Sequence, residues 1–226
     1  MKFDDLSIVI PRKNEAQGIQ RIINSVKKYS DDIVVVDGNS NDGTKELCET
    51  NDIKFINEIS NGKITGKGNA MRIGVAASKN KYVLFFDADG SHNPEDINFL
   101  YDTIKKTNVD LVISSRRTGG SLDLNNSFFG LIRSWGCDFL AYIINKKYNT
   151  NLSDVLYSFR IIKKNTFLNL NLLENKFGIE QEMVQKCLKN KKYVIEVPSR
   201  EFSRGWGKSK LKTISGIYFL FMLFKY

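Results

Sequence analysis

Short apolar runs alternate with amphipathic stretches through the first half of this chain, and this order constrains the fold more than any other feature. Residues 33–36 (IVVV) and 82–86 (YVLFF) show no alternation of polar and apolar side chains, as expected of parallel strands that helices cover on both faces. Residues 15–29 instead place isoleucine and valine three and four positions apart, which is the spacing of an amphipathic helix. This order predicts an α/β fold with a mostly parallel, Rossmann-like central sheet and helices on both faces.

The predicted elements extend along most of the chain. The predicted strands are residues 6–10, 33–36, 54–59, 82–86, 110–114, 158–162 and 193–197. The predicted helices are residues 15–29, 44–51, 69–78, a segment opened by Pro94, 127–145 and 178–190. No repeat, linker or low-complexity tract interrupts the 226 residues, of which 42% are hydrophobic, so we expect a single domain over residues 1–212. An apolar helix over residues 213–226 is expected to follow it.

Positive charge is concentrated near the C-terminus. The formal net charge is +9, and residues 186–226 alone hold ten basic and two acidic side chains, a balance of +8. This distribution predicts an anionic partner for the last part of the chain.

Cysteine and histidine are too sparse for a zinc cluster. Cys48, Cys137 and Cys187 lie far apart, and His92 is the single histidine. An odd number of widely spaced cysteines favours a reducing compartment. No apolar segment has the length of a signal peptide or a membrane span, so we expect a cytoplasmic protein.

Polar residues gather directly after four of the predicted strands. They occupy residues 11–15, 37–44, 87–89 and 114–117. In open α/β sheets, ligands bind beyond the carboxyl ends of the strands. The four loops therefore predict one site at that edge of the sheet.

Asp87-Ala88-Asp89 is the most informative of these loops. Its two carboxylates follow an all-apolar strand and suit a hard divalent cation, which takes one or two carboxylates and completes its shell with water and phosphate oxygens. The alternative is a solvated turn. The position after YVLFF, beside three other polar strand ends, favours the metal site.

Gly66-Lys67-Gly68 precedes a predicted helix and offers a second candidate phosphate contact. Backbone N–H groups and the Lys67 ammonium could face a phosphate there, although a plain helix-entry turn fits equally well. The spacing matches neither a P-loop nor a dinucleotide fingerprint.

These motifs together resemble family 2 glycosyltransferases of the GT-A fold. The resemblance rests on residues 7–15 (SIVIPRKNE), 34–44 (VVVDGNSNDGT), 66–68 (GKG) and 87–89 (DAD), in that order. Residues 204–211 (RGWGKSKL) are similar to the R-x-x-G-x-S-K-L loop of dolichyl-phosphate mannosyltransferase-like enzymes. The resemblance implies a nucleotide-sugar donor and a Mg²⁺ or Mn²⁺ ion.

The resemblance also assigns roles to individual residues. The residues it places around the nucleotide are Pro11, Lys13, Glu15 and Asp37. Asp87 would contact ribose or metal, Ala88 would lie between the two carboxylates, and Asp89 would coordinate the metal. The cations it assigns to phosphates are Arg116, Arg204 and Lys210, the last two on a basic lid loop at residues 199–212. Residues 1–117 would then form the nucleotide-sugar half and residues 118–212 the acceptor half.

Four positions in three segments depart from the family pattern. Arg12-Lys13 replaces a small residue and tyrosine, Gly38 replaces a second aspartate, and Ser91 stands where a metal-binding glutamine is common. These departures leave the donor base and the second protein ligand of the metal open.

The acceptor is not fixed by these motifs. A sugar hydroxyl needs a carboxylate base, for which the candidates are Asp154, Glu180 and Glu182. A lipid phosphate needs no base but requires cations, for which the candidates are Arg116, Arg117, Arg133, Arg204 and Lys210. The apolar helix at 127–145 and the basic and then apolar tail favour a lipid at a membrane surface, although a terminal helix packed on the core is an alternative for the tail.

The leading hypothesis is an inverting, metal-dependent glycosyltransferase that moves a hexose from a GDP- or UDP-sugar to a polyprenyl or dolichyl phosphate. It would work at the cytoplasmic face of a membrane through peripheral contact. The alternatives are transfer to a hydroxyl of a growing surface glycan and a non-catalytic nucleotide-sugar-binding protein. Nucleic acid is not expected as a partner because no nucleic-acid-binding motif accompanies the charge.

Overall fold

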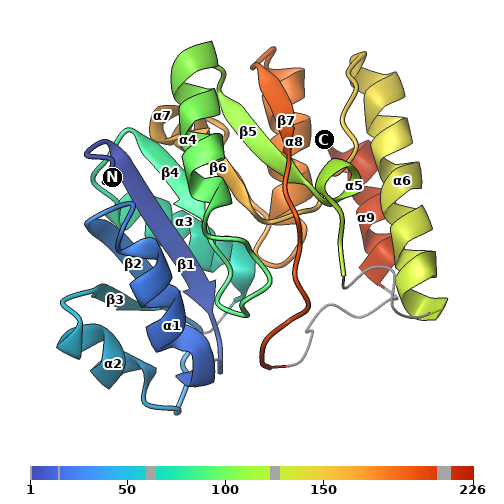
Figure 1. Cartoon of the computed structure of the whole chain (residues 1–226). Coiled ribbons are helices and arrows are strands. Elements are labelled where there is room, and N and C mark those ends of the chain that lie inside the picture. Colours follow the sequence, from blue (N-terminus) through green and yellow to red (C-terminus); the bar gives the residue numbers. More distant parts are fainter. Residues whose placement is uncertain (1, 15, 60–64, 123–127, 208–214) are drawn as a thin grey trace.

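A seven-stranded sheet forms the centre of the computed structural model, which describes residues 2–14, 16–59, 65–122, 128–207 and 215–226 (Figure 1). The strands are β1 (Leu6–Arg12), β2 (Asp32–Asp37), β3 (Lys54–Asn57), β4 (Tyr82–Phe85), β5 (Leu111–Ser115), β6 (Arg160–Lys163) and β7 (Val194–Pro198). Their spatial order is β3-β2-β1-β4-β6-β5-β7. Strand β6 runs antiparallel to both β4 and β5, whereas the other pairings are parallel. The predicted α/β fold with a mostly parallel sheet is thus confirmed.

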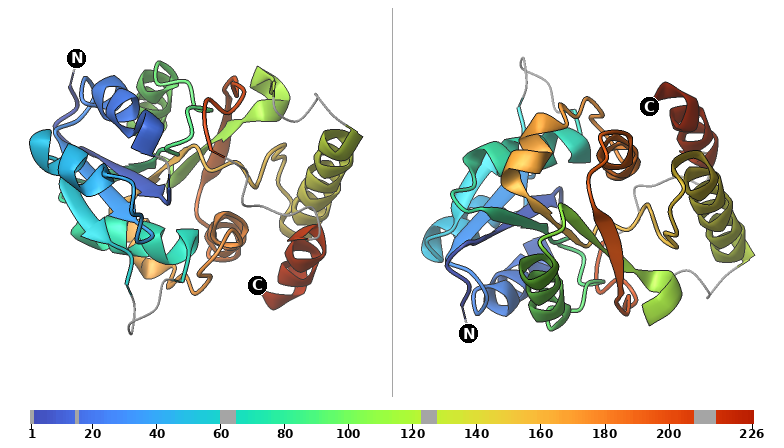
Figure 2. Two further views of the ribbon diagram at one scale, coloured as in Figure 1. Left: turned by 90° about the horizontal axis from the view of Figure 1, so that it is seen from below. Right: turned by 90° about the horizontal axis from the view of Figure 1, so that it is seen from above.

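Helices cover both faces of the sheet (Figure 2). They are α1 (Ala16–Val26), α2 (Thr44–Thr50), α3 (Lys67–Ala77), α4 (Asp96–Thr107), α5 (Arg116–Gly119), α6 (Phe128–Tyr148), α7 (Lys164–Asn169), α8 (Ile179–Lys189) and α9 (Ser215–Lys225). Alternate side chains of β1 enter two separate cores. Ile8 packs in one core with residues of α1 and α4, and Val9 packs in the other with residues of α3 and α8.

The sequence predicts most elements to within a few residues. Helix α4 begins two residues after Pro94, and α6 continues to Tyr148 rather than ending at residue 145. The strand expected at 158–162 is displaced to Arg160–Lys163, and the short helices α5 and α7 were not predicted. The antiparallel direction of β6 was not predicted either, and it has a direct consequence for the site.

The apolar C-terminal helix forms as α9 and packs against α6 and α8. Phe219, Met222 and Leu223 are buried, while the amides of Gln181 and Gln185 on α8 donate to the carbonyls of Phe219 and Met222. This agrees with the alternative of a terminal helix docked on the core. None of the helices within the described part of the chain is long and apolar enough to cross a membrane.

Candidate active site

The carboxyl ends of β1, β2, β4 and β5 lie at one edge of the sheet, as the parallel order requires (Figure 1). Asp37, which ends β2, is buried, and both of its carboxylate oxygens accept hydrogen bonds from Ser40, from its backbone N–H at 2.6 Å and from its hydroxyl at 2.7 Å. Arg12 lies beside it, with Nε 3.4 Å from Asp37 Oδ1 and Nη2 2.7 Å from Asp42 Oδ2. The buried Arg12 Nε and Nη1 find no hydrogen-bond partner among the described residues. The end of β2 is therefore ordered by Ser40 and by a buried arginine.

Asp87 lies just beyond β4 and is held from two sides. Lys67 Nζ is 2.9 Å from Asp87 Oδ1 and 3.0 Å from Glu180 Oε1, while the Ser158 hydroxyl donates to Asp87 Oδ2 at 2.5 Å. Burial alone would raise the pKa of Asp87, but Lys67 and these neighbours outweigh it and lower that pKa. Burial would likewise lower the pKa of Lys67, and the two carboxylates raise it instead. Asp87 is therefore a carboxylate and Lys67 an ammonium at neutral pH.

Asp89 has a second cation as its partner. Its Oδ1 accepts from the backbone N–H of Ser91 at 2.9 Å and from the Ser91 hydroxyl at 2.7 Å. Arg204 Nη2 lies 2.8 Å from its other oxygen, Oδ2. Each carboxylate of the Asp87/Asp89 pair thus has its own cation within the protein.

The basic loop lies directly over the Asp87/Asp89 turn. The backbone N–H groups of Phe202 and Gly205 donate to the carbonyls of Ser91 and Asp89, both at 2.9 Å. Trp206 Nε1 donates to the Ala88 carbonyl at 2.7 Å. The described part of the predicted lid therefore contacts the metal-binding candidates; Lys210 and residues 208–212 lie outside the described residues.

Two glycines leave room for the Trp206 indole. A Cβ at Gly18 would lie 1.7 Å from Trp206 Cζ2, and one at Gly90 would lie 2.9 Å from Cη2. Gly90 also has a backbone φ of 80°, which residues other than glycine rarely adopt. The indole occupies a slot between α1 and the Asp87/Asp89 turn that only glycine permits.

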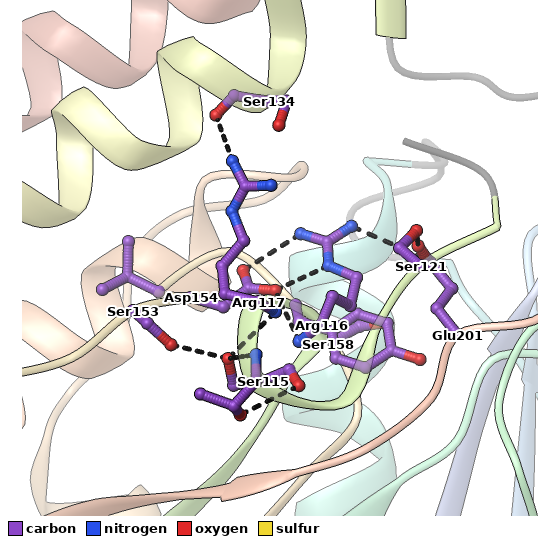
Figure 3. A network of polar contacts seen from close by, with 12 residues as sticks. Ser115, Arg116, Arg117, Ser121, Ser134, Ser153, Asp154, Ser158 and Glu201 are labelled. Atoms are coloured by element: carbon purple, nitrogen blue, oxygen red, sulfur yellow. Dashed lines mark hydrogen bonds and ion pairs between the residues drawn. The ribbon is translucent and has the colours of Figure 1, made fainter. Parts of the chain in front are cut away.

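Arg116 and Asp154 form a separate buried network at the end of β5 (Figure 3). Arg116 Nε and Nη2 donate to Asp154 Oδ2 and Oδ1 at 2.6 and 3.0 Å, and Nη1 lies 3.5 Å from Glu201 Oε1. The guanidinium also lies 4.7 Å from the centre of the Tyr157 ring. Burial would raise the pKa of Asp154, but Arg116 lowers it overall. The predicted phosphate-binding cation and the predicted base are thus each other's partners in this structure.

Neighbouring Arg117 is also engaged within the protein. Its Nη2 donates to the carbonyl of Ser134 on α6 at 2.7 Å (Figure 3). The same atom lies 2.5 Å from Asp138 Oδ1. The side chain of Arg133, which is another candidate cation on α6, is outside those that the structure describes.

The Gly66-Lys67-Gly68 segment acts as a helix entry. The N–H of Gly66 donates to Glu58 Oε1 at 3.0 Å, and the N–H of Gly68 donates to the Asn175 carbonyl at 2.8 Å. A Cβ at Gly68 would lie 2.2 Å from the Glu174 carbonyl oxygen. These backbone N–H groups already donate to protein acceptors. The part of this motif that contacts the site is therefore the Lys67 side chain, which pairs with Asp87.

The three candidate bases have different positions. Glu180 lies beside the site through Lys67, whereas Asp154 is bound to Arg116. Glu182 is buried and accepts the backbone N–H groups of Leu173 and Glu174, which fixes the loop before α8. Glu182 therefore stabilises the fold.

The structure brings four predicted residues together in two ion pairs at the Asp87/Asp89 turn. Lys67 pairs with Asp87, and Arg204 pairs with Asp89. Lys13 is exposed, with its side chain against Gly38, and Pro11 pairs with Val36 in the sheet. Glu15 lies outside the described residues.

Two functional candidates were not predicted as site residues. His92 is buried, with Nδ1 3.2 Å from the backbone N of Asp87 and Nε2 3.2 Å from Ser158 Oγ. The sequence feature that could have indicated His92 is its position five residues after Asp87. Nothing in the local sequence indicates Ser158, because the antiparallel pairing of β6 with β4 brings it there.

The residues present fit a hard divalent cation shared with a diphosphate. Within the described residues, no group of three His, Cys, Asp or Glu side chains could hold a metal by itself. A Mg²⁺ ion in a phosphate site needs one or two carboxylates and takes its other ligands from phosphate and water, and Asp87 and Asp89 supply such a pair. Lys67 and Arg204 are placed to balance the charge of a diphosphate as well.

Comparison with solved structures identifies the fold. Glucosyl-3-phosphoglycerate synthase from Mycobacterium tuberculosis, solved with Mg²⁺ and UDP, superposes with a TM-score of 0.75 at 18% identity. The match covers 97% of this chain and 79% of that one. The chain thus has the GT-A glycosyltransferase fold.

Sequence comparison defines the family. The model described as glycosyl transferase family 2 matches residues 7–170. The chain therefore belongs to glycosyl transferase family 2 and is a glycosyltransferase, which confirms the resemblance inferred from its motifs.

Three relatives show what the chain resembles within that family. Glycosyltransferase AglJ of Haloferax volcanii is 31% identical over 210 residues, which are 89% of this chain and 64% of that protein. Undecaprenyl-phosphate mannosyltransferase of Micrococcus luteus is 26% identical over 90% of this chain and 86% of its own length. Dolichol-phosphate mannosyltransferase of Pyrococcus furiosus is 30% identical over 92% of this chain and 59% of its own length. The chain thus spans about two thirds or less of the first and third of these relatives.

Proposed function

We propose that this glycosyltransferase moves a hexose from a GDP- or UDP-linked donor to a polyprenyl or dolichyl phosphate, with inversion at the anomeric carbon. The observation that carries the proposal is the Asp87/Asp89 pair at the carboxyl end of β4, with Lys67 and Arg204 as the flanking cations. The mannosyltransferase relatives support a lipid-phosphate acceptor. The reaction would take place at the cytoplasmic face of a membrane.

The donor diphosphate would lie against the Asp87/Asp89 turn. A Mg²⁺ or Mn²⁺ ion held there by the two carboxylates would neutralise charge on the departing diphosphate. Lys67 would orient Asp87, and Arg204 would exchange its contact with Asp89 for a contact with phosphate. Trp206 would keep the loop over the bond that breaks and exclude water, which would otherwise hydrolyse the donor.

A phosphate acceptor suits the carboxylates of this site better than a hydroxyl acceptor. Asp154 is neutralised by Arg116, and Glu180 is paired with Lys67, so neither is poised to remove a proton. A lipid phosphate is already a nucleophile at neutral pH because its second pKa is about 6. The predicted role of Asp154 as a base is not needed for this acceptor, and Asp154 would instead orient Arg116.

Apolar side chains on α6 and α9 provide a surface for the lipid. Leu131, Trp135, Phe139 and Tyr142 follow one another on α6 at intervals of four, four and three residues, and each is at least 46% exposed. Ile217, Phe221 and Phe224 are exposed on α9, which packs beside α6 (Figure 2). The first turn of α6 points to the same edge of the molecule as the carboxyl end of β1 (Figure 1). Such a surface suits the interfacial layer of a bilayer, where tryptophan and tyrosine are favoured.

A nucleotide-release assay tests the proposal. The protein would be incubated with Mn²⁺ and each of a panel of UDP- and GDP-sugars, with a short-chain polyprenyl phosphate, with an oligosaccharide, or with neither. We expect release that depends on the lipid phosphate and is absent in Asp89→Ala, whereas Asp102→Ala, on the exposed face of α4, serves as the control. Release stimulated only by the oligosaccharide would instead support the glycan-hydroxyl acceptor. Donor binding without release would support the non-catalytic alternative.

Vesicle sedimentation tests the membrane surface separately. We expect the protein to sediment with vesicles that contain phosphatidylglycerol, and the double variant Trp135→Ser/Phe139→Ser to remain in the supernatant. Phe99→Ser removes an aromatic residue of similar exposure from α4 and should sediment like the unmodified protein. Equal sedimentation of the double variant would refute the assignment of this surface.

A further inference from the structure

A buried histidine and a buried serine form a closed ring of hydrogen bonds with Asp87. The backbone N–H of Asp87 donates to His92 Nδ1 at 3.2 Å, so the proton of the neutral ring lies on Nε2. Nε2 lies 3.2 Å from Ser158 Oγ, and the Ser158 hydroxyl donates to Asp87 Oδ2 at 2.5 Å. Each donor in the ring thus faces one acceptor.

Aromatic packing fixes the imidazole in this orientation. The His92 ring stacks on Phe159 with 4.6 Å between centroids, and it meets Phe86 and Tyr157 edge to face at 5.1 and 5.2 Å. His92 is 2% exposed and Ser158 is 6% exposed. The ring therefore has little freedom to turn its Nε2 away from Ser158.

The sheet topology places Ser158 beside Asp87. Phe85, the last residue of β4, pairs with Arg160, the first residue of β6. Asp87 lies two residues after the end of β4 and Ser158 two residues before the start of β6, so continuing the same antiparallel register places them opposite one another. The inserted strand β6 thus supplies a hydroxyl to the carboxyl end of β4.

We propose that His92 and Ser158 are positioning residues that fix the Asp87 carboxylate for the nucleotide donor. His92 accepts from the Asp87 backbone and donates to Ser158, which leaves the serine proton to point at Asp87 Oδ2. Ser158 then holds Oδ2, and Lys67 Nζ lies 2.9 Å from Oδ1 and donates to Oδ2 at 3.1 Å. The two side chains together set the plane of the carboxylate. This inference rests on the proposed function, because it concerns how Asp87 meets the donor diphosphate.

A matched pair of serine variants tests the inference. Ser158→Ala removes the hydroxyl that reaches Asp87. Ser114→Ala removes the hydroxyl of a fully buried serine on β5, which has no hydrogen-bond partner among the described residues. The dissociation constants of UDP and GDP would be measured by calorimetry with Mn²⁺ present, together with the thermal midpoint of each variant.

We expect Ser158→Ala to weaken nucleotide binding about tenfold, the effect typical of removing an outer partner of a metal-site ligand. Ser158→Thr, which keeps the hydroxyl, should recover most of the affinity, and Ser114→Ala should leave it unchanged. His92→Phe, which keeps an aromatic ring in the same packing, should weaken binding to a similar degree as Ser158→Ala.

Two results would overturn the inference while leaving the proposed function intact. The first is that Ser158→Ala or His92→Phe binds nucleotide as tightly as the unmodified protein does. The other is a loss of thermal stability in Ser158→Ala with no change in affinity, which would make the ring purely structural. If the unmodified protein bound neither nucleotide, the proposed function and the inference would both fail.

Discussion

Lys67 joins the buried Glu180 carboxylate to the Asp87 carboxylate, whose side chain is 21% exposed, so its removal is expected to destabilise the protein strongly. Its Nζ lies within 3.0 Å of both Asp87 and Glu180, and its side chain is 14% exposed. Lys67→Met keeps most of the side-chain volume but leaves two like charges facing each other without a cation. Breaking a buried ion pair by removing one partner costs about 3–5 kcal/mol, and we expect a loss in this range in the free energy of unfolding at pH 7.

The destabilisation should depend on pH in a defined direction. In the unmodified protein the pKa of Asp87 lies below its ordinary value. Asp87 therefore stabilises the fold above the unfolded pKa of about 3.9, and this contribution is lost as the pH falls through the lower folded pKa. Without Lys67, the desolvation that raises the pKa of Asp87 loses its largest opposing contribution, so we expect this pKa to rise and the native variant to take up a proton at a higher pH than the unmodified protein does. The difference between variant and unmodified protein should therefore shrink as the pH falls from 7 towards 5.

Urea denaturation followed by far-ultraviolet circular dichroism at pH 7 and pH 5 measures both effects. Lys105→Met is the matched control, because Lys105 pairs with Asp5 with half of its side chain exposed, and surface pairs contribute only about 0–1 kcal/mol. A loss at pH 7 no larger than that of Lys105→Met would refute the reasoning. An equal loss at both pH values would also refute it.

Three further substitutions test the site and its loop. Asp89→Ala should abolish turnover and Mn²⁺-dependent nucleotide binding, and retained activity would remove Asp89 from the metal site. Arg204→Ala should lower the transfer rate tenfold or more, from the loss of a charge-assisted contact of about 1.5–3 kcal/mol. The same variant should bind Mn²⁺ more tightly without nucleotide, because Arg204 no longer competes for Asp89, and unchanged Mn²⁺ affinity in calorimetry would refute that competition. Gly18→Ala should expel Trp206 from its slot and shift the tryptophan emission to longer wavelength, and an unchanged spectrum would show that the indole does not occupy the slot in solution.

The parallel part of the sheet could be predicted from the sequence because its strands carry an unambiguous local signal. Residues 33–36 and 82–86 are apolar without alternation, and the polar residues that follow them mark the carboxyl edge. The Asp87/Asp89 turn and its position after β4 follow from the same pattern.

The direction of β6 could not be predicted, because strand direction depends on which neighbours pair and not on local composition. Arg160–Lys163 has no pattern that distinguishes an antiparallel insertion from a further parallel strand. The contact between Ser158 and Asp87, 71 residues apart in the chain, arises from that insertion.

The carboxylates that pair with the predicted cations could not be predicted from the sequence either. Arg116 and Asp154 were each assigned a function from residue type and resemblance, and the structure shows them bound to each other. Such pairing depends on a buried geometry that brings together segments 38 residues apart. The conclusion for the site is that Lys67 and Arg204, rather than Arg116, are the cations that contact the carboxylate pair.

Identification of the lipid product would test the proposed reaction most directly. The protein would be incubated with Mn²⁺, the donor sugar that supports nucleotide release, and a short-chain polyprenyl phosphate, and the organic extract would be analysed by mass spectrometry. We predict a product heavier than the acceptor by one hexose residue and linked through the phosphate, and no such product with Asp89→Ala. Nucleotide release with an unmodified lipid, or transfer of the hexose to an added oligosaccharide alone, would contradict the lipid-phosphate acceptor.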